Sequence, residues 1–321
     1  MSSLASKAGN ANPAVPESGW DALPAEYRTP EQAPSLAEAR GYCERLARTH
    51  YENFSVATWF LPARLRPHFY SVYAYCRISD DLGDEVGDAA QSLALLNAWQ
   101  EQLDGCYRSL AGGEELPRHP VFVALRETVR ELEIPRQPFA DLLVAFRQDQ
   151  RVTRYPTFAD LLGYCVNSAD PVGRLVLYVC GYRDEERQRL SDRTCTALQL
   201  ANFWQDVAVD YAKGRIYLPQ EDMQRFGVPE TVIAARQATP QFRELMRFEV
   251  ERAQEWFARG LPLVGQVDKA LAIDLELFTR GGQEILRAIE RQDFDVLRQR
   301  PAISKPRRLA LVLRAALRKV W

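Results

Sequence analysis

Four acidic residues crowd six positions of the sequence, at Asp80, Asp81, Asp84 and Glu85. On an α-helix, the step from Asp80 to Asp84 is about 40° of rotation and about 6 Å of rise, so both carboxylates would project from one face. Like charges at this spacing repel each other by roughly a few tenths of a kcal/mol per pair. A hard divalent cation such as Mg²⁺ would offset that repulsion, because it prefers oxygen ligands. The alternative is a solvated acidic helix end, although acids there oppose the helix dipole.

A second series of oxygen-bearing side chains lies about 120 residues later, at Asn202, Asp206 and Asp210. These residues are four apart, so they would form one stripe over two helical turns. Their neighbours are mostly apolar, which predicts a buried helix, and an unpaired buried carboxylate is costly. A metal ion is the best explanation of such a stripe. The apolar neighbours are Leu200, Ala201, Phe203, Trp204, Val207 and Val209.

The two clusters together predict two helices that face each other across a cavity, as in other helical bundles with metal sites. Two or three Mg²⁺ ions could hold a diphosphate between them and neutralise it as a leaving group. Arg77, Lys213 and Arg215 lie close in sequence and could contact phosphate oxygens, or could form local salt bridges instead. Aromatic side chains could stabilise a carbocation through their π faces. The candidates are Phe54, Phe69, Tyr73, Tyr164, Phe203 and Trp204.

The sequence predicts helices almost throughout, and these helices must position the residues above. Apolar residues recur at three and four positions, and no run of alternating strand residues competes with them. Helix starts are predicted at Ser35–Glu38, Thr157–Asp160, Ser191–Asp192 and Thr239–Pro240. Glycines 181, 214 and 227 are predicted stops. We expect an all-α fold, with a flexible leader over residues 1–33 and one helical domain over residues 34–321.

The composition excludes several classes of protein. The 321 residues are 46% hydrophobic and 26% charged with a formal net charge of −2, so a nucleic-acid partner is not indicated. Six scattered cysteines without a CxxC pair argue against a disulfide framework or a zinc site. We find neither a secretory signal nor an apolar run long enough to span a membrane. We therefore expect a cytoplasmic protein, peripheral at most on the inner face of the cell membrane.

These motifs resemble those of the squalene and phytoene synthase family. The first family motif, Tyr-x-x-Cys-Arg-x-x-Asp-x-x-x-Asp, is matched from Tyr73 to Asp84, and the second from Gln199 to Asp210, followed by Arg215-Ile216-Tyr217. The resemblance extends from about His50 to about Tyr217. It implies the all-α isoprenoid synthase fold around a central cavity, dependence on Mg²⁺, and head-to-head prenyl chemistry.

Finer features resemble the bacterial branch of this family that forms hydroxysqualene in the hopanoid pathway. They are the segment from His50 to Phe54 and the segment from Tyr164 to Arg174. In the second segment, the common family pattern is Tyr-Cys-x-x-Val-Ala-Gly-x-Val-Gly, whereas this chain has Ser168-Ala-Asp-Pro171. Because proline removes a backbone donor, Asp170-Pro171 should interrupt the helix and kink it. We hypothesise that the altered helix wall changes where the carbocation is quenched.

The resemblance also implies roles for individual residues. The substrate would be presqualene diphosphate, and water would capture the cation, so no NAD(P)H is expected. The lack of a GxGxxG turn agrees with this only weakly. The expected catalytic residues are Tyr73, Arg77 and Tyr164. The expected Mg²⁺ ligands are Asp80, Asp84, Asn202, Asp206 and Asp210. The expected substrate-binding residues are His50, Asn53, Phe54, Asp81, Arg174, Gln199, Lys213, Arg215 and Tyr217.

Several alternatives stay open. Presqualene diphosphate synthase, squalene synthase and phytoene synthase share the motifs and differ in product. A terpene cyclase is less well matched because of the Tyr73-to-Arg77 segment, and a chain-elongating prenyl synthase would need a second DDxxD motif. From a different class, the chain could be a non-catalytic helical scaffold at the membrane.

The C-terminal segment has eight Lys or Arg residues and no acid after Asp295. Leu309, Val312, Leu313, Ala316, Leu317 and Val320 follow a helical period. Such a basic amphipathic helix suits an anionic membrane surface. The alternative is a final helix that docks on the core with a basic outer face, and this is slightly favoured because basic residues at helix ends complement the helix dipole.

Overall fold

The computed structural model describes residues 20, 21, 23–50 and 62–320, and the regular structure in this part is helical. The all-α prediction is confirmed. The α-helices are α1 (Leu36–His50), α3 (Arg66–Asp84), α4 (Ala89–Leu110), α5 (Pro120–Leu132), α6 (Gln137–Asp149), α7 (Phe158–Ser168), α8 (Asp170–Val179), α9 (Glu185–Ala212), α10 (Gln220–Arg225), α11 (Glu230–Ala234), α12 (Pro240–Gly260), α13 (Lys269–Arg291) and α14 (Lys305–Val320). Short 3₁₀ helices lie at Ala25–Tyr27, Ala63–Leu65 and Leu261–Gly265.

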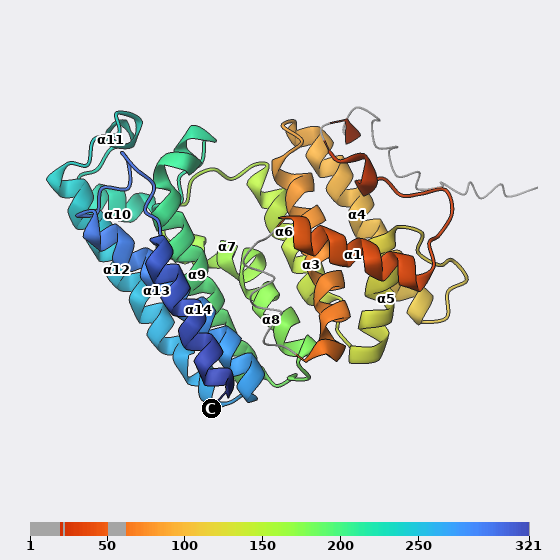
Figure 1. The fold of residues 1–321 in the computed structure, drawn as a ribbon. Coiled ribbons are helices and arrows are strands. Elements are labelled where there is room, and N and C mark those ends of the chain that lie inside the picture. Colours follow the sequence, from red (N-terminus) through yellow and green to blue (C-terminus); the bar gives the residue numbers. More distant parts are fainter. Residues whose placement is uncertain (1–19, 22, 51–61, 321) are drawn as a thin grey trace, which may run out of the picture.

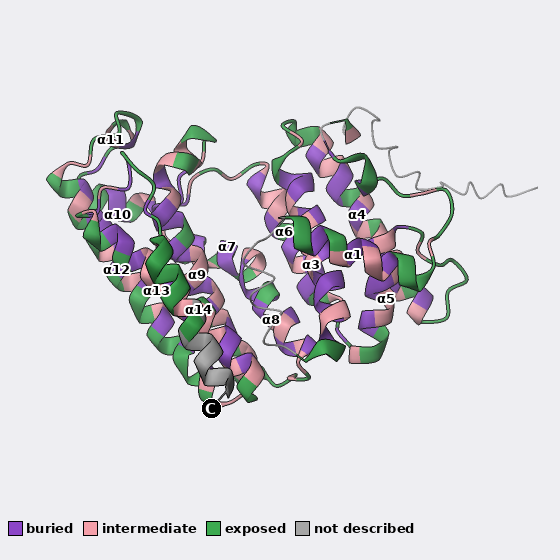
Figure 2. Cartoon of the chain, viewed as in Figure 1, coloured by how far each residue is buried: buried purple, intermediate pink, exposed green. Residues whose placement is uncertain are grey.

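The helices form two groups, each around its own buried apolar cluster. In Figure 1, α1 and α3 to α6 lie on one side, and α9 to α14 lie on the other. Tyr75, Trp99 and Phe122 are among the side chains that fill the first cluster, and Trp204 and Phe257 belong to the second. Figure 2 shows the buried residues on the facing sides of the helices in both groups.

Helices α7 and α8 join the two groups, because both contact α6 and both contact α9. They lie between the groups in Figure 1. The seam that they bridge is where the two acidic clusters of the sequence meet. All six cysteines are unpaired, as expected for a chain without a disulfide framework.

Most of the helix ends follow from the sequence. The Thr157 hydroxyl and the Asp160 carboxylate form a reciprocal capping box at the start of α7. Thr239 caps α12 with proline in its first turn. The glycines at 181, 214 and 227 have φ of +89°, +82° and +65°, which is the left-handed conformation that ends a helix. The start predicted at Ser191–Asp192 is wrong, because Asp184 caps α9 seven residues earlier.

The predicted leader extends too far along the chain. Leu23 and Tyr27 are buried in the first apolar cluster, and the Tyr27 hydroxyl donates to Asp81 Oδ2 at 2.6 Å. These two side chains were missed because two apolar residues in a Pro- and Ala-rich segment give no helical period. Residues 1–19 and 22 lie outside the described residues, so the leader is not tested there.

The interruption predicted at Asp170-Pro171 is present. Helix α7 ends at Ser168, Ala169 has φ −116° and ψ −51°, and α8 begins at Asp170. The Asp170 carboxylate is buried and accepts a hydrogen bond from the Thr196 hydroxyl of α9 at 2.9 Å. The break therefore lets α8 change direction while Asp170 fixes its first turn against α9.

Gly173 sets how closely α8 approaches α9. A Cβ at this position would lie 2.3 Å from Ser191 Oγ and 2.5 Å from Cys195 Sγ, which is closer than real side chains come. Gly163, on α7, has nothing within 4 Å of the equivalent point.

We predict that Gly173→Ala lowers the free energy of unfolding by about 1–3 kcal/mol, because the added methyl group overpacks the contact between α8 and α9. Gly163→Ala is the matched control, and it should raise that free energy by up to about 1 kcal/mol, because alanine restricts the unfolded chain. Urea denaturation of both variants measures the difference. Equal effects at the two positions would contradict the packing argument.

Candidate active site

A cavity of about 490 Å³ lies at the seam between the two helical groups, and both acidic clusters line it. Its walls come from α3, α6, α7, α8, α9 and the segment that follows α9. The lining residues are Tyr73, Cys76, Arg77, Asp80, Asp84, Leu142, Phe146, Asp149, Tyr164, Ser168, Val172, Gln199, Asn202, Phe203, Asp206, Val209, Asp210, Lys213, Arg215 and Tyr217. The sequence prediction that the two clusters face one cavity is confirmed.

Two of the cavity carboxylates are destabilised in their charged form. Burial raises the pKa of Asp80 to about 6, and the neighbouring Asp84 adds to the shift. Burial likewise raises the pKa of Asp210 to about 7, with Asp206 as the largest charged contributor. Positive charge brought into the cavity would stabilise both ionised forms.

Two arginines from distant segments pair with Asp84 and Asp206, which also line the cavity. Both terminal nitrogens of Arg215 lie 3.1 Å from Asp84 Oδ1, across 131 residues of sequence. Arg300 forms a two-pronged ion pair with Asp206, in which its Nη2 lies 2.9 Å from Oδ2. Arg300 is in the segment between α13 and α14, and the sequence reading missed it because no local pattern connects it to α9.

The segment after α9 is held by backbone contacts that aim Arg215 and Tyr217 at the cavity. Gly214 reverses the chain, and the Arg215 N–H bonds back to the Asp210 carbonyl at 2.8 Å. The Ile216 N–H bonds to the Thr153 carbonyl at 2.9 Å, in a β-bridge between Arg154 and Ile216. Residues on either side of Ile216 are thereby fixed at the cavity wall.

The lining residues fit Mg²⁺ only in company with a substrate. Among the described residues, no three His, Cys, Asp or Glu side chains converge closely enough to hold a metal ion by themselves. Mg²⁺ usually takes one or two carboxylates and completes its shell with waters and substrate phosphates. Asp80 and Asp210 fit such a shared site, because both have raised pKa values. Neither has an arginine as close as those that pair with Asp84 and Asp206.

An aromatic wall closes the cavity beside the acids. Phe203 and Tyr217 are stacked, with ring centroids 3.9 Å apart, and Tyr164 lies against both. These rings and Tyr73 line the cavity as predicted candidates. Phe69 and Trp204 instead lie in the two buried clusters and do not line the cavity.

Asp149, at the end of α6, is a site residue that the sequence reading missed. Its Oδ2 accepts a hydrogen bond from the Tyr164 hydroxyl at 2.8 Å, and its Oδ1 is buried without a partner among the described residues. Burial raises the pKa of Asp149 to about 7. The signal was available, because Asp149 continues the helical series of Leu142 and Phe146 that faces the cavity.

Two predicted substrate-binding residues do not line the cavity. Asp81 is buried between Arg77, whose Nε lies 3.0 Å from Oδ2, and the Tyr27 hydroxyl, so it orients Arg77 rather than facing the cavity. Arg174 forms two hydrogen bonds to Asp192, of 2.9 and 2.8 Å, and thereby joins α8 to α9. Tyr27, from the segment before α1, thus helps to hold Asp81 away from the cavity, and Asp192 of α9 does the same for Arg174. Asn53, Phe54 and the side chain of His50 lie outside the described residues.

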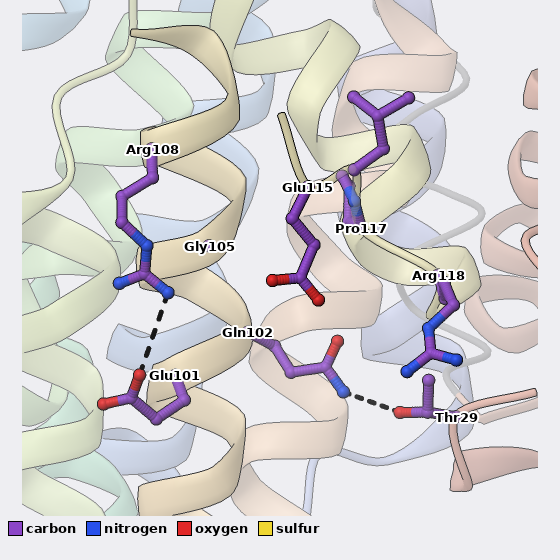
Figure 3. A pocket seen from close by; sticks show the side chains of 9 residues that line it. Thr29, Glu101, Gln102, Gly105, Arg108, Glu115, Pro117 and Arg118 are labelled. Atoms are coloured by element: carbon purple, nitrogen blue, oxygen red, sulfur yellow. Dashed lines mark hydrogen bonds and ion pairs between the residues drawn. The ribbon is translucent and has the colours of Figure 1, made fainter. Parts of the chain in front are cut away.

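A second hollow, of about 340 Å³, lies between α4 and the segment that precedes α5. Figure 3 shows Arg108 directed toward Glu101, and Gln102 directed toward Thr29. Four of its polar groups thus form two pairs, and none of the residues predicted to carry the chemistry lines it.

Helices that present two acid-bearing faces and an aromatic wall to one cavity define a class of prenyl diphosphate-processing synthases. The sequence matches the squalene/phytoene synthase family over residues 47–307, so the chain belongs to that family. The solved squalene synthase HpnC from Alicyclobacillus acidocaldarius is 46% identical, with a TM-score of 0.75 over 86% of this chain and 98% of that one.

Two further relatives show how far the family extends. A solved dehydrosqualene synthase is 27% identical, with a TM-score of 0.79 over 89% of this chain and 98% of that one. The 15-cis-phytoene synthase of Synechococcus elongatus is 30% identical over 88% of this chain and 94% of its own length. The isoprenoid synthase fold that the sequence implied is therefore confirmed.

We predict that Asp149→Asn stabilises the protein at pH 8 more than at pH 5. The carboxyl has a pKa of about 7 in the folded state and about 3.9 in the unfolded chain. Between these values the folded state holds a proton that the unfolded state has released, so wild-type stability falls as the pH rises. Asparagine removes this penalty and still accepts the Tyr164 hydrogen bond.

The stabilisation of Asp149→Asn relative to wild type should be larger at pH 8 than at pH 5 by about 1–3 kcal/mol of unfolding free energy. Urea denaturation of both proteins without added metal measures it. Asp141→Asn, on the same helix but outside the cavity lining, is the control and should give the same small change at both pH values. A pH-independent effect of Asp149→Asn would contradict the buried-carboxylate argument.

Proposed function

We propose that the protein is a Mg²⁺-dependent hydroxysqualene synthase, which converts presqualene diphosphate and water into hydroxysqualene and diphosphate. The observation that carries the proposal is the joining of both acidic clusters and an aromatic wall in one cavity. Two further observations support hydroxysqualene as the product. They are the 46% identity to squalene synthase HpnC and the sequence of the Ser168–Pro171 segment.

In this proposal the polar end of the cavity binds the diphosphate. When bound, Mg²⁺ would neutralise the leaving group, with Asp80, Asp84, Asn202, Asp206 and Asp210 as its proposed ligands. Arg215 and Lys213, which line the cavity, supply the positive charge that the chain itself brings to the diphosphate oxygens. Arginine suits this role because its planar fork makes paired hydrogen bonds to phosphate.

The apolar part of the cavity handles the carbocation that remains. Tyr73, Tyr164, Phe203 and Tyr217 present ring faces, which stabilise cations. They also keep bulk water away from the reacting carbon. The Tyr164 hydroxyl donates to Asp149, which fixes the orientation of that ring at the wall.

Two alternatives remain. The similarity to the 15-cis-phytoene synthase of Synechococcus elongatus favours a synthase that condenses two prenyl diphosphates. A non-catalytic scaffold is the alternative from another class, and retention of both acidic clusters in a lined cavity argues against it.

We predict that the purified protein with Mg²⁺ and no reductant converts presqualene diphosphate to hydroxysqualene and leaves farnesyl diphosphate unchanged, as measured by gas chromatography and mass spectrometry. Asp84→Asn should lower turnover about 100-fold, the usual cost of losing one charge-stabilising group. Glu85→Gln changes the next residue, which does not line the cavity, and should keep turnover within about twofold.

Consumption of farnesyl diphosphate would place the chain among the condensing synthases instead. Turnover of neither substrate would contradict the proposed reaction and favour the scaffold.

We also propose that helix α14 contacts the membrane surface. No helix in the described part of the chain is long and apolar enough to cross a membrane. Helix α14 packs along α13, and Arg307 Nη1 lies 3.0 Å from Glu284 Oε2, which agrees with a docked final helix. Leu309 and Leu313 are nevertheless 59% and 54% exposed, so part of its apolar surface is free for lipid.

We predict that the double substitution Leu309→Glu and Leu313→Glu lowers binding to anionic vesicles at least about tenfold, because it replaces apolar contact by charge repulsion. Sedimentation with liposomes measures this. Leu116→Glu is the control, since Leu116 is also 59% exposed but lies far along the chain in the segment before α5. Unchanged binding in the double variant would leave α14 as a docked helix only.

A further inference from the structure

The wall of the active-site cavity contains one hydroxyl group that nothing in the fold explains. Ser168 is the last residue of α7 and lines the cavity. Its Oγ is buried and has no hydrogen-bond partner among the described residues. A buried unpartnered hydroxyl is unfavourable, and native structures usually satisfy such a group with an ordered water or a ligand.

The helix break beside Ser168 adds further hydrogen-bonding capacity. Because Pro171 has no N–H, the carbonyl of Asn167 lacks the donor that a continuous helix would give it. The N–H of Val172 bonds to the carbonyl of Ala169 at 3.1 Å rather than to that of Ser168. The interruption thus leaves the Asn167 carbonyl without its usual helical donor, one residue before the unpartnered Ser168 hydroxyl. A held water needs two to four polar partners.

Part of the cavity wall is apolar. Leu142, Phe146 and Val172 line it, and the common family pattern has valine where this chain has Ser168. Relative to that pattern, Ser168 adds a hydroxyl to the cavity lining, and a hydroxyl can hold one water.

We propose that Ser168 positions the water that quenches the carbocation, which makes it a specificity-determining residue for the alcohol product. The inference rests on the proposed function, since only a water-quenched reaction needs such a residue. The water oxygen forms a C–O bond to the cation, and the resulting oxonium ion loses one proton to the released diphosphate. No oxidant or reductant takes part.

The test compares Ser168→Ala with Ser92→Ala. Ser92 is the matched control, because its hydroxyl is also buried and unpartnered but lies on α4, outside the cavity. Each variant is supplied with presqualene diphosphate and Mg²⁺ in H₂¹⁸O. Diphosphate release and the labelled and unlabelled terpene products are measured separately.

We expect Ser168→Ala to release diphosphate within about threefold of the wild-type rate while the hydroxysqualene fraction falls at least about fivefold in favour of elimination products. Ser168→Thr keeps the hydroxyl and should therefore retain part of the hydroxysqualene fraction that Ser168→Ala loses. Ser92→Ala should leave the product ratio unchanged.

The outcomes separate the two proposals. If wild-type protein makes hydroxysqualene and Ser168→Ala gives the same product ratio, the role of Ser168 is overturned and the proposed function stands. If wild-type protein makes no ¹⁸O-labelled alcohol at all, the proposed function fails first. Loss of diphosphate release together with the alcohol would make Ser168 a structural residue and also overturn the inference.

Discussion

The structure depends on holding mutually repelling carboxylates in a place where water screens them poorly. Burial and mutual repulsion push the pKa values of Asp80 and Asp210 to about 6 and 7. The fold answers with counter-charges from far along the chain, since Arg215 pairs with Asp84 across 131 residues and Arg300 pairs with Asp206 across 94. The first acidic stripe is therefore compensated only when the two helical groups close on each other, whereas the second is compensated within its own group.

This arrangement links stability to chemistry. A site optimised for folding would replace the buried acids by neutral groups, as expected for Asp149, whose unpartnered oxygen and raised pKa oppose folding at neutral pH. Proteins retain such unfavourable groups mainly at functional sites. In the proposed reaction the same negative charge would attract Mg²⁺ and, through it, the diphosphate, so the cost in stability would also be the source of binding.

The sequence predicted what depends on local spacing and missed what depends on long-range partners. The four-residue steps placed the Asp80 and Asp206 stripes on helix faces that do meet at one cavity. Asp81 and Arg174 were misread, because Tyr27 and Asp192, their partners, come from other segments and turn them away. Arg300 could not be found from spacing, since a loop residue reaches α9 only through the fold. Asp149 could have been found, because it continues an apolar helical series.

The helix break at Ala169 resolves a conflict within the proposed reaction. A carbocation survives only in a cavity that excludes water, yet an alcohol product requires one water at one carbon. A uniformly apolar wall meets the first need and fails the second, whereas an open polar pocket would quench the cation at random. Placing Ser168 at the end of α7, where its buried hydroxyl has no partner among the described residues, gives one water a hydrogen-bonding group at one point of the cavity lining. Because Asp170 is held by Thr196 of α9, that point is fixed relative to the helix that carries the second acidic stripe.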